Sequence, residues 1–228
     1  MLKSLIRLAK SGLPDRDILL PVVAGPFKGA RFFSNPQVAL RKVFGVYEHE
    51  LTGWLNKVLP RADVVIDVGA NDGYFTFGSA KAMQRANRPV RVIAIESSPT
   101  HVRQLEQART RNGFSEKEIS IVAAAAGAAD GDGHRTLDSV ARGIDPSAHV
   151  FVKVDVEGAE GDVLYGAQQL LRKGNFFLIE IHTQALFDSL PPMFASRGLD
   201  VHYINQEPHS ILGRERRDES NWWLVSRL

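Results

Sequence analysis

An acidic residue followed by two glycines marks the segment of this chain that is best suited to hold a ligand. Residues 64–68 are apolar apart from Asp67, Gly69 and Gly73 follow four positions apart, and a helical pattern begins at Tyr74. This order predicts a buried strand, a tight turn and the start of a helix. Glycine lets the turn approach a ligand closely, and the N–H groups at a helix start favour a polar or anionic group.

The spacing within this loop separates two kinds of nucleotide-like ligand. A dinucleotide fingerprint G-x-G-x-x-G starting at Gly69 requires glycine at positions 71 and 74, which hold Asn71 and Tyr74. A nicotinamide oxidoreductase is therefore disfavoured, and an ordinary βα turn is the non-functional interpretation. The loop resembles motif I of the class I S-adenosylmethionine (SAM) methyltransferases, which packs on the methionine part of the cofactor. That resemblance implies cofactor contacts from Asp67, Gly69, Ala70, Asn71, Asp72, Gly73, Tyr74 and Phe75.

A second acid supports a ribose-containing ligand. Glu96 ends the next apolar segment, 91–96. In the dinucleotide fold an acid about 20 residues beyond the glycine loop hydrogen-bonds a ribose hydroxyl. SAM shares this geometry, because both ligands present a ribose over the end of the adjacent strand. We therefore expect Glu96, with Ser97 beside it, to bind the ribose, although a solvated strand-end glutamate is the simpler alternative. In the alanine-rich run 123–129, we expect the backbone to meet the adenine at Ala124 and Ala125.

Polar groups also close two later apolar segments, 149–155 and 176–182. Alternation along a strand places Lys153 and Asp155 on one face, and Glu180 and His182 on one face of the next strand. Ligands of open α/β sheets bind at the carboxyl ends of the strands. Buried carboxylates must be paired or functional, and Lys153 is placed to neutralise Asp155 or Glu180. We expect the catalytic residues at Asp155, Glu157, Glu180 and His182.

These four residues suit the removal of a proton from a hydroxyl group. His182 has the best unperturbed pKa for a base near neutral pH, and Asp155 or Glu180 can act if partly desolvated. A satisfied strand-end histidine is the alternative for His182. The same oxygen and imidazole groups are able to hold Mg²⁺ or Mn²⁺. Their spacing is not diagnostic of a metal, however, so a metal site is possible but not favoured.

Three segments in order narrow the resemblance to the FkbM-type methyltransferases. The chain has D-V-G-A-N-D-G at 67–73, D-V-E-G-A-E at 155–160, and a strand that ends near Glu180. Upstream, 25–29 and 45–48 also look like that family's N-terminal part. The resemblance implies SAM as cofactor and a hydroxyl of a sugar, glycan or natural product as acceptor. We expect acceptor contacts from Tyr47, Glu48 and Lys153.

Two other functions stay open at this point. Ribose 2′-O-methylation of RNA typically needs two lysines with an aspartate and a glutamate. Lys153, Asp155 and Glu180 match that set only in part, because a clear second lysine is missing. A SAM-binding module without catalysis is the other alternative, which the polar strand ends disfavour. Methylation of base amino groups is disfavoured, because the expected Pro-Pro-aromatic sequence is missing after Asp155.

Composition is that of one enzyme-sized α/β unit. The chain has 228 residues, of which 44% are hydrophobic and 24% charged, and its formal net charge is only +2. This balance gives no strong nucleic-acid signal. Because cysteine is absent, disulfides and thiolate metal sites are excluded. We expect a cytoplasmic enzyme without a transmembrane segment. Residues 1–10 form a short amphipathic pattern that either docks on the body or touches a membrane surface.

Strand patterns that alternate with helix patterns predict a Rossmann-like class I methyltransferase fold with a mostly parallel seven-stranded sheet. We expect an N-terminal extension or cap at 1–59 and the SAM-dependent methyltransferase domain at 60–228. The expected strands lie at 63–68, 90–96, 118–125, 149–155, 176–182, 200–204 and 222–227. The expected helices lie at 37–57, 74–86, 99–112, 159–173 and 184–197.

Overall fold

The computed structural model describes residues 12–211, 213 and 222–228. The amphipathic pattern at 1–10 lies outside these residues. Within them, the structure contains no helix that is both long enough and apolar enough to cross a membrane. The expected cytoplasmic location stays a prediction.

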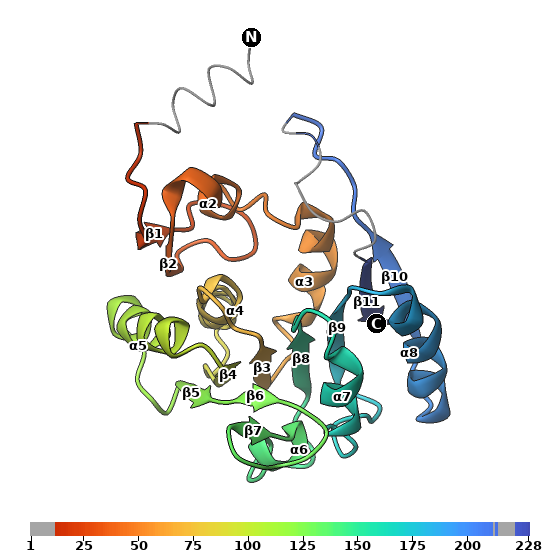
Figure 1. Ribbon diagram of the computed structural model, residues 1–228. Helices are drawn as coiled ribbons and strands as arrows, with labels where there is room; N and C mark the ends of the chain where they lie inside the picture. Colours follow the sequence, from red (N-terminus) through yellow and green to blue (C-terminus); the bar gives the residue numbers. More distant parts are fainter. Residues whose placement is uncertain (1–11, 212, 214–221) are drawn as a thin grey trace.

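A seven-stranded sheet forms the centre of the molecule (Figure 1). The strand order is β10-β11-β9-β8-β3-β4-β5, and β11 runs antiparallel to both of its neighbours while the other pairs are parallel. The predicted mostly parallel sheet is therefore confirmed. The strands are β3 Val64–Val68, β4 Val92–Glu96, β5 Ile119–Ala123, β8 Val150–Val154, β9 Phe176–Ile181, β10 Val201–Asn205 and β11 Trp222–Ser226.

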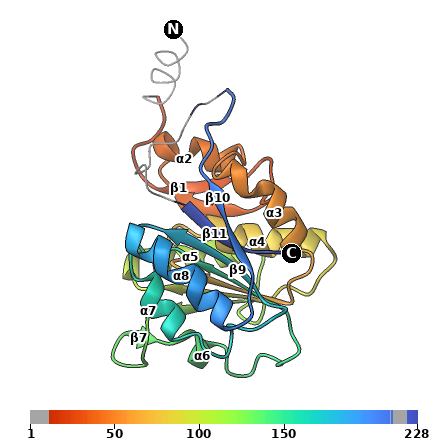
Figure 2. The same ribbon diagram turned by 90° about the vertical axis from the view of Figure 1, so that its right-hand side faces the viewer.

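Helices cover both faces of this sheet (Figures 1 and 2). On one face lie α3 Thr52–Val58, α4 Tyr74–Arg85 and α5 Pro99–Asn112, and on the other α6 Leu137–Val140, α7 Glu160–Tyr165 and α8 Gln184–Ser196. The helix predicted over 159–173 is shorter than expected. It ends at Tyr165, and at the next residue, Gly166, a Cβ atom would lie 2.1 Å from the carbonyl oxygen of Gly127. Close backbone packing therefore stops this helix.

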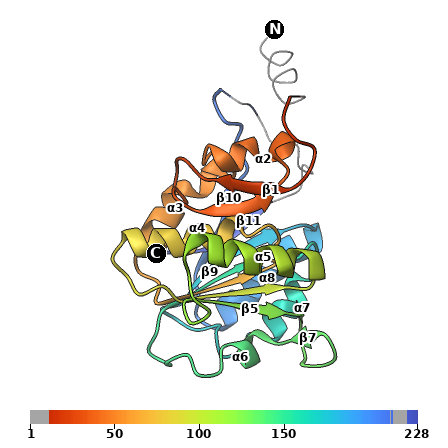
Figure 3. The same cartoon turned by 90° about the vertical axis from the view of Figure 1, so that its left-hand side faces the viewer.

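The N-terminal extension adds a further layer on the outer side of α4 and α5 (Figure 3). Its hairpin, β1 Ile18–Pro21 and β2 Arg31–Ser34, contacts both helices. The single helix predicted over 37–57 is wrong, because α2 Pro36–Val43 and the short η1 His49–Leu51 are separate. Gly45 and Glu48 take left-handed backbone angles between them. A Cβ atom on Gly45 would lie 2.1 Å from the carbonyl oxygen of Ala24, so the hairpin fixes this break.

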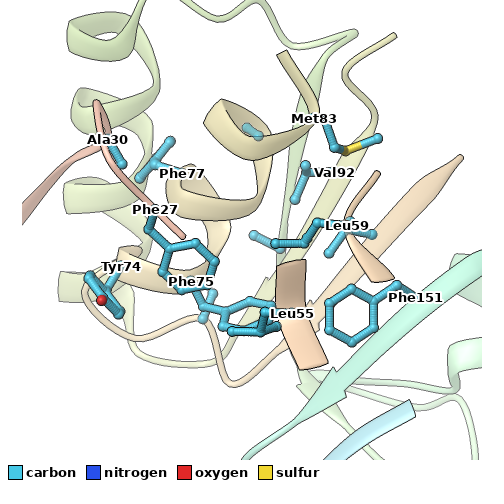
Figure 4. Packing of buried hydrophobic residues seen from close by; sticks show 14 of the residues in the cluster. Phe27, Ala30, Leu55, Leu59, Tyr74, Phe75, Phe77, Met83, Val92 and Phe151 are labelled. Carbon is cyan, nitrogen blue, oxygen red and sulfur yellow. The ribbon is translucent and has the colours of Figure 1, made fainter. Parts of the chain in front are cut away.

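Aromatic packing joins the extension to the sheet (Figure 4). The Phe27 ring lies 5.1 Å from the rings of both Tyr74 and Phe75, in edge-to-face contacts. Gly78 of α4 provides the space, because a Cβ atom there would lie 2.3 Å from Phe27. One hydrophobic cluster thus contains residues from both sides of residue 59, and the expected domain boundary there stays a prediction.

Candidate active site

A cavity of about 1200 Å³ opens at the carboxyl ends of the central parallel strands. Much of the predicted site meets there, although its parts lie far apart in the sequence. The predicted cofactor residues on its wall are Gly69, Asn71, Glu96, Ser97, Ala124 and Ala125. The predicted catalytic and acceptor residues on its wall are Tyr47, Asp155, Glu157, Glu180 and His182.

The other predicted site residues lie outside this lining. They are Glu48, Asp67, Ala70, Asp72, Gly73, Tyr74, Phe75 and Lys153. Tyr74 and Phe75 belong to the hydrophobic core instead, and Asp72 forms an ion pair with Lys42 at 2.6 Å. Asp72 also accepts a hydrogen bond from the backbone of Tyr74. Asp72, Tyr74 and Phe75 therefore support the glycine loop from the side of the hydrophobic core and do not line the cavity.

Asp67 and Lys153 form a buried ion pair beneath the glycine loop. Lys153 Nζ lies 3.4 Å from Asp67 Oδ1 and 3.2 Å from Asp155 Oδ2, and it donates to the carbonyl oxygen of Gly69. Asp67 also accepts a hydrogen bond from Thr76. Burial raises the pKa of Asp67 despite the opposing effect of Lys153. Burial alone would lower the pKa of Lys153, but the surrounding carboxylates raise it above its usual value. Lys153 therefore stays charged and ties the two strand ends together.

Gly69 permits close contact between two strand-end loops. Its φ of +75° is left-handed, and a Cβ atom would lie 1.9 Å from the carbonyl oxygen of Asp155. The sequence suggested that this glycine makes room for a ligand. The structure shows that it also makes room for the loop that carries Asp155. Any side chain at this position would displace that loop.

Glu96 is held in place at the cavity wall by two backbone groups. Its Oε2 atom accepts from the N–H of Asn71, and its Oε1 atom accepts from the N–H of Ser98, both at 2.8 Å. Only 8% of the residue is exposed. Because each carboxylate oxygen has more than one lone pair, both can still accept a hydroxyl hydrogen from a ligand. The arrangement suits the two hydroxyls of a ribose.

His182 is oriented by a buried carboxylate. Its Nδ1 atom lies 2.7 Å from Oε1 of Glu160, which also accepts from the N–H of Gly158. The hydrogen bond with Glu160 raises the pKa of His182 above its usual value. Burial raises the pKa of Glu160, but the hydrogen bonds from the His182 ring and from backbone N–H groups, including that of Gly158, together outweigh it, so the pKa lies below its usual value. From the sequence alone, Glu160 is only a favourable charge in the first turn of a helix.

The other ring nitrogen of His182 faces two carboxyl groups. Nε2 lies 3.9 Å from Asp155 Oδ1 and 3.9 Å from Glu180 Oε2. Asp155 is also within hydrogen-bond reach of the side chain of Glu180. Burial raises the pKa of Asp155, but Lys153 and this hydrogen bond together bring the pKa below its usual value. Glu157 is exposed at the rim, with a left-handed φ of 52°. Three of the four predicted catalytic residues therefore form one compact group.

The comparisons with known proteins agree with this architecture. Residues 133–201 match the family model described as the methyltransferase FkbM domain. A crystal structure of a methyltransferase FkbM from Methylobacillus flagellatus aligns with a TM-score of 0.56 at 18% identity, over 73% of this chain and 44% of that one. This chain therefore spans less than half of that protein's length. No curated protein matches the chain.

Two further solved structures share the fold at low sequence identity. The putative methyltransferase yhhF from Escherichia coli aligns with a TM-score of 0.53 at 14% identity, over 92% of this chain and 98% of that one. TrmK of M. capricolum, solved with S-adenosylhomocysteine (SAH), aligns with a TM-score of 0.51 at 11% identity, over 79% and 67%. The strand order and these matches show the fold of the class I methyltransferases. The family match confirms the resemblance to the FkbM-type methyltransferases.

Proposed function

We propose that this protein transfers a methyl group from SAM to a hydroxyl group of a sugar, glycan or natural-product acceptor. One observation carries the proposal: a single cavity is lined both by the braced Glu96 carboxylate and by the group of Asp155, Glu180 and His182. The cofactor features and the proton acceptors that this reaction requires therefore share one space.

The residues on the cavity wall fit SAM. The Glu96 carboxylate keeps lone pairs for the ribose, and the backbone of Ala124 and Ala125 lines the same space, as expected for the adenine. A volume of about 1200 Å³ exceeds the roughly 300–1,000 Å³ of an ordinary ligand pocket, which leaves room for an acceptor. The structure of TrmK with SAH supports this choice of cofactor for the fold.

When bound, SAM supplies an electrophilic methyl group on a positively charged sulfur. The chain's own residues have two tasks, which are to align the acceptor oxygen and to accept its proton. Alignment alone supplies several kcal/mol, and a positioned base contributes roughly 10²–10⁴ in rate. Asp155, Glu180 and His182 offer proton acceptors within one small region of the cavity wall. Lys153 keeps Asp155 ionised and so maintains a proton acceptor there.

Lys153 also bears on the RNA alternative. Ribose 2′-O-methylation of RNA typically needs two lysines, whereas the one lysine that matches that set, Lys153, is buried against Asp67 and Asp155. The direct acceptor contact expected of Lys153 thus has less support than its role between the two carboxylates. Tyr47, in contrast, lines the cavity and stays a proposed acceptor contact.

The test combines binding and turnover. We expect SAM and SAH to bind in isothermal titration, and methyl transfer to occur on a member of a panel of sugars, lipid-linked glycans and phenols, with RNA oligonucleotides as a separate arm. The variants D155N, E180Q and H182A should each lose turnover while SAH affinity stays near that of the wild type. The exposed Glu116→Ala provides a control. Binding of NADH without SAM, or full turnover in all three variants, would refute the proposal.

A further inference from the structure

We propose that Asp155, Glu180 and His182 form a binding site for one divalent cation of the Mg²⁺ or Mn²⁺ class. This inference deepens the proposed function, because the cation would lie where the acceptor hydroxyl must be held. It rests on the positions of the three side chains, on the orientation of the histidine and on the local excess of negative charge.

The three side chains have a spacing that one ion can bridge. Their nearest oxygen and nitrogen atoms all lie within 4.8 Å of one another. At Mg²⁺ ligand distances of about 2.0–2.1 Å, two adjacent ligands lie about 3 Å apart and two opposite ligands about 4.2 Å apart. The distances from His182 Nε2 to Asp155 Oδ1 and to Glu180 Oε2 are both 3.9 Å, between these limits. Small side-chain rotations therefore suffice to place all three around an ion.

The orientation of His182 is a second and independent observation. Its Nδ1 atom is bound to the fully buried Glu160 at 2.7 Å, so Nε2 is directed towards Asp155 and Glu180. Metal-binding histidines almost always donate their other ring N–H to a carboxylate or carbonyl, which fixes the tautomer and the ring. Glu160 provides this support here. Its Oε2 atom is buried without a hydrogen-bond partner among the described residues, so the carboxylate keeps its negative charge concentrated near the ring.

The local charge also favours a cation. Four carboxyl groups, those of Asp67, Asp155, Glu160 and Glu180, surround the single ammonium group of Lys153 and the ring of His182. Asp155 and Glu180 also face the same atom, His182 Nε2, at 3.9 Å each. A divalent ion between the two carboxyl groups would offset the repulsion of their like charges.

The donor set distinguishes among metals. Two carboxylates and one imidazole form a hard, oxygen-rich set, and the cavity leaves the remaining positions open to water or to an acceptor hydroxyl. Mg²⁺ binds through one or two carboxylates and retains several such open positions, and carboxylate sets also suit Mn²⁺. Because the chain contains no cysteine, thiolate ligands that would select softer metals are excluded.

The experiment uses Mn²⁺ as the probe on the full chain, with free Mn²⁺ followed by electron paramagnetic resonance. We expect one Mn²⁺ to bind per chain and Mg²⁺ to compete. The variants E180Q and H182A should weaken binding at least tenfold, and E160Q, which loses the support of His182, should weaken it roughly 10- to 100-fold. The matched control is D162N, because Asp162 is an exposed carboxylate of α7 outside the cavity lining. Circular dichroism identifies any variant that fails to fold.

The outcomes separate this inference from the proposed function. If wild-type protein leaves the free Mn²⁺ signal unchanged, or if D162N weakens binding as much as E180Q, the cation site is refuted. SAH titration in the presence of a chelator tests the cofactor independently. An unchanged free Mn²⁺ signal together with SAH binding and methyl transfer would refute the cation site and leave the proposed function intact, whereas Mn²⁺ binding without SAH binding would refute the proposed function and leave the cation site intact.

Discussion

Replacement of Glu96 by alanine should weaken the binding of SAH and also loosen the loop that holds it. If the carboxylate accepts ribose hydroxyls, its loss costs about 1.5–3 kcal/mol, or roughly ten- to a hundredfold in Kd. The hydrogen bonds from the N–H groups of Asn71 and Ser98 are lost as well. Water can reach both groups, so we expect a loss of about 1–2 kcal/mol in the free energy of unfolding. For a chain of this size that lowers Tm by roughly 2–8 °C.

The assay must separate ribose contact from loop bracing. Isothermal titration with SAH and with a deoxyribose analogue of SAH forms a double-mutant cycle. In the wild type the analogue should bind about tenfold more weakly than SAH, whereas in Glu96→Ala the two ligands should bind alike. Glu116→Ala, which removes an exposed carboxylate outside the cavity lining, should change neither affinity. If the analogue is discriminated equally in the wild type and in Glu96→Ala, Glu96 does not contact the ribose and the reasoning fails.

Three further changes test the fold around the site. Gly69→Ala should lower the free energy of unfolding, measured in urea, by more than about 2 kcal/mol, because left-handed strain of roughly 1–2 kcal/mol adds to the clash with Asp155. Gly113 is the control, because it has a similar φ with open space around it. Equal losses in Gly69→Ala and Gly113→Ala would exclude the clash. Phe27→Ala should lower the free energy of unfolding by about 3–5 kcal/mol. Phe44→Ala, at an exposed position, should lower it by less than about 0.5 kcal/mol. An unchanged Tm in Phe27→Ala would contradict the structural role of Phe27 between the extension and α4. The pKa of Asp63 is lowered, mainly because the carboxylate accepts a hydrogen bond from the backbone of His149. Its contribution to stability is therefore present above the ordinary pKa of 3.8 and is lost as pH falls through the lower folded value. Asp63→Asn should therefore lower Tm at pH 7 and have less effect at pH 3, and an equal difference at both pH values would count against it.

The sequence predicted the parts of the structure that local patterns determine. Most strands of the sheet are predictable because they are short apolar or β-branched runs beside a turn or a helix pattern. Alternation within 149–155 and 176–182 also placed Asp155 near Glu180 and His182, which the distances bear out. Such predictions succeed because period and strand direction fix which side chains meet at a sheet edge.

Features that depend on tertiary contacts were missed. The helix predicted over 37–57 is interrupted because Gly45 packs against the hairpin, a contact between distant segments that no local pattern shows. From the sequence, Glu160 is only a charge at a helix start, and its hydrogen bond with His182 forms only because β9 lies beside α7. The available signal was its place in the D-V-E-G-A-E segment. The hairpin β1–β2 was also missed, since its two strands have only four residues each.

The contact between Gly69 and Asp155 makes the two sides of the cavity one mechanical unit. The first residue belongs to the loop expected to hold the cofactor, the second to the group expected to hold the acceptor, and Lys153 bonds to both. A ligand that shifts one loop must therefore shift the other. Thermodynamic linkage then requires reciprocity: whatever factor the cofactor contributes to acceptor affinity, the acceptor returns to cofactor affinity. Cooperative binding of cofactor and acceptor would then arise from the close contact that Gly69 permits, and the coupling factor would measure how strongly that contact links the two loops.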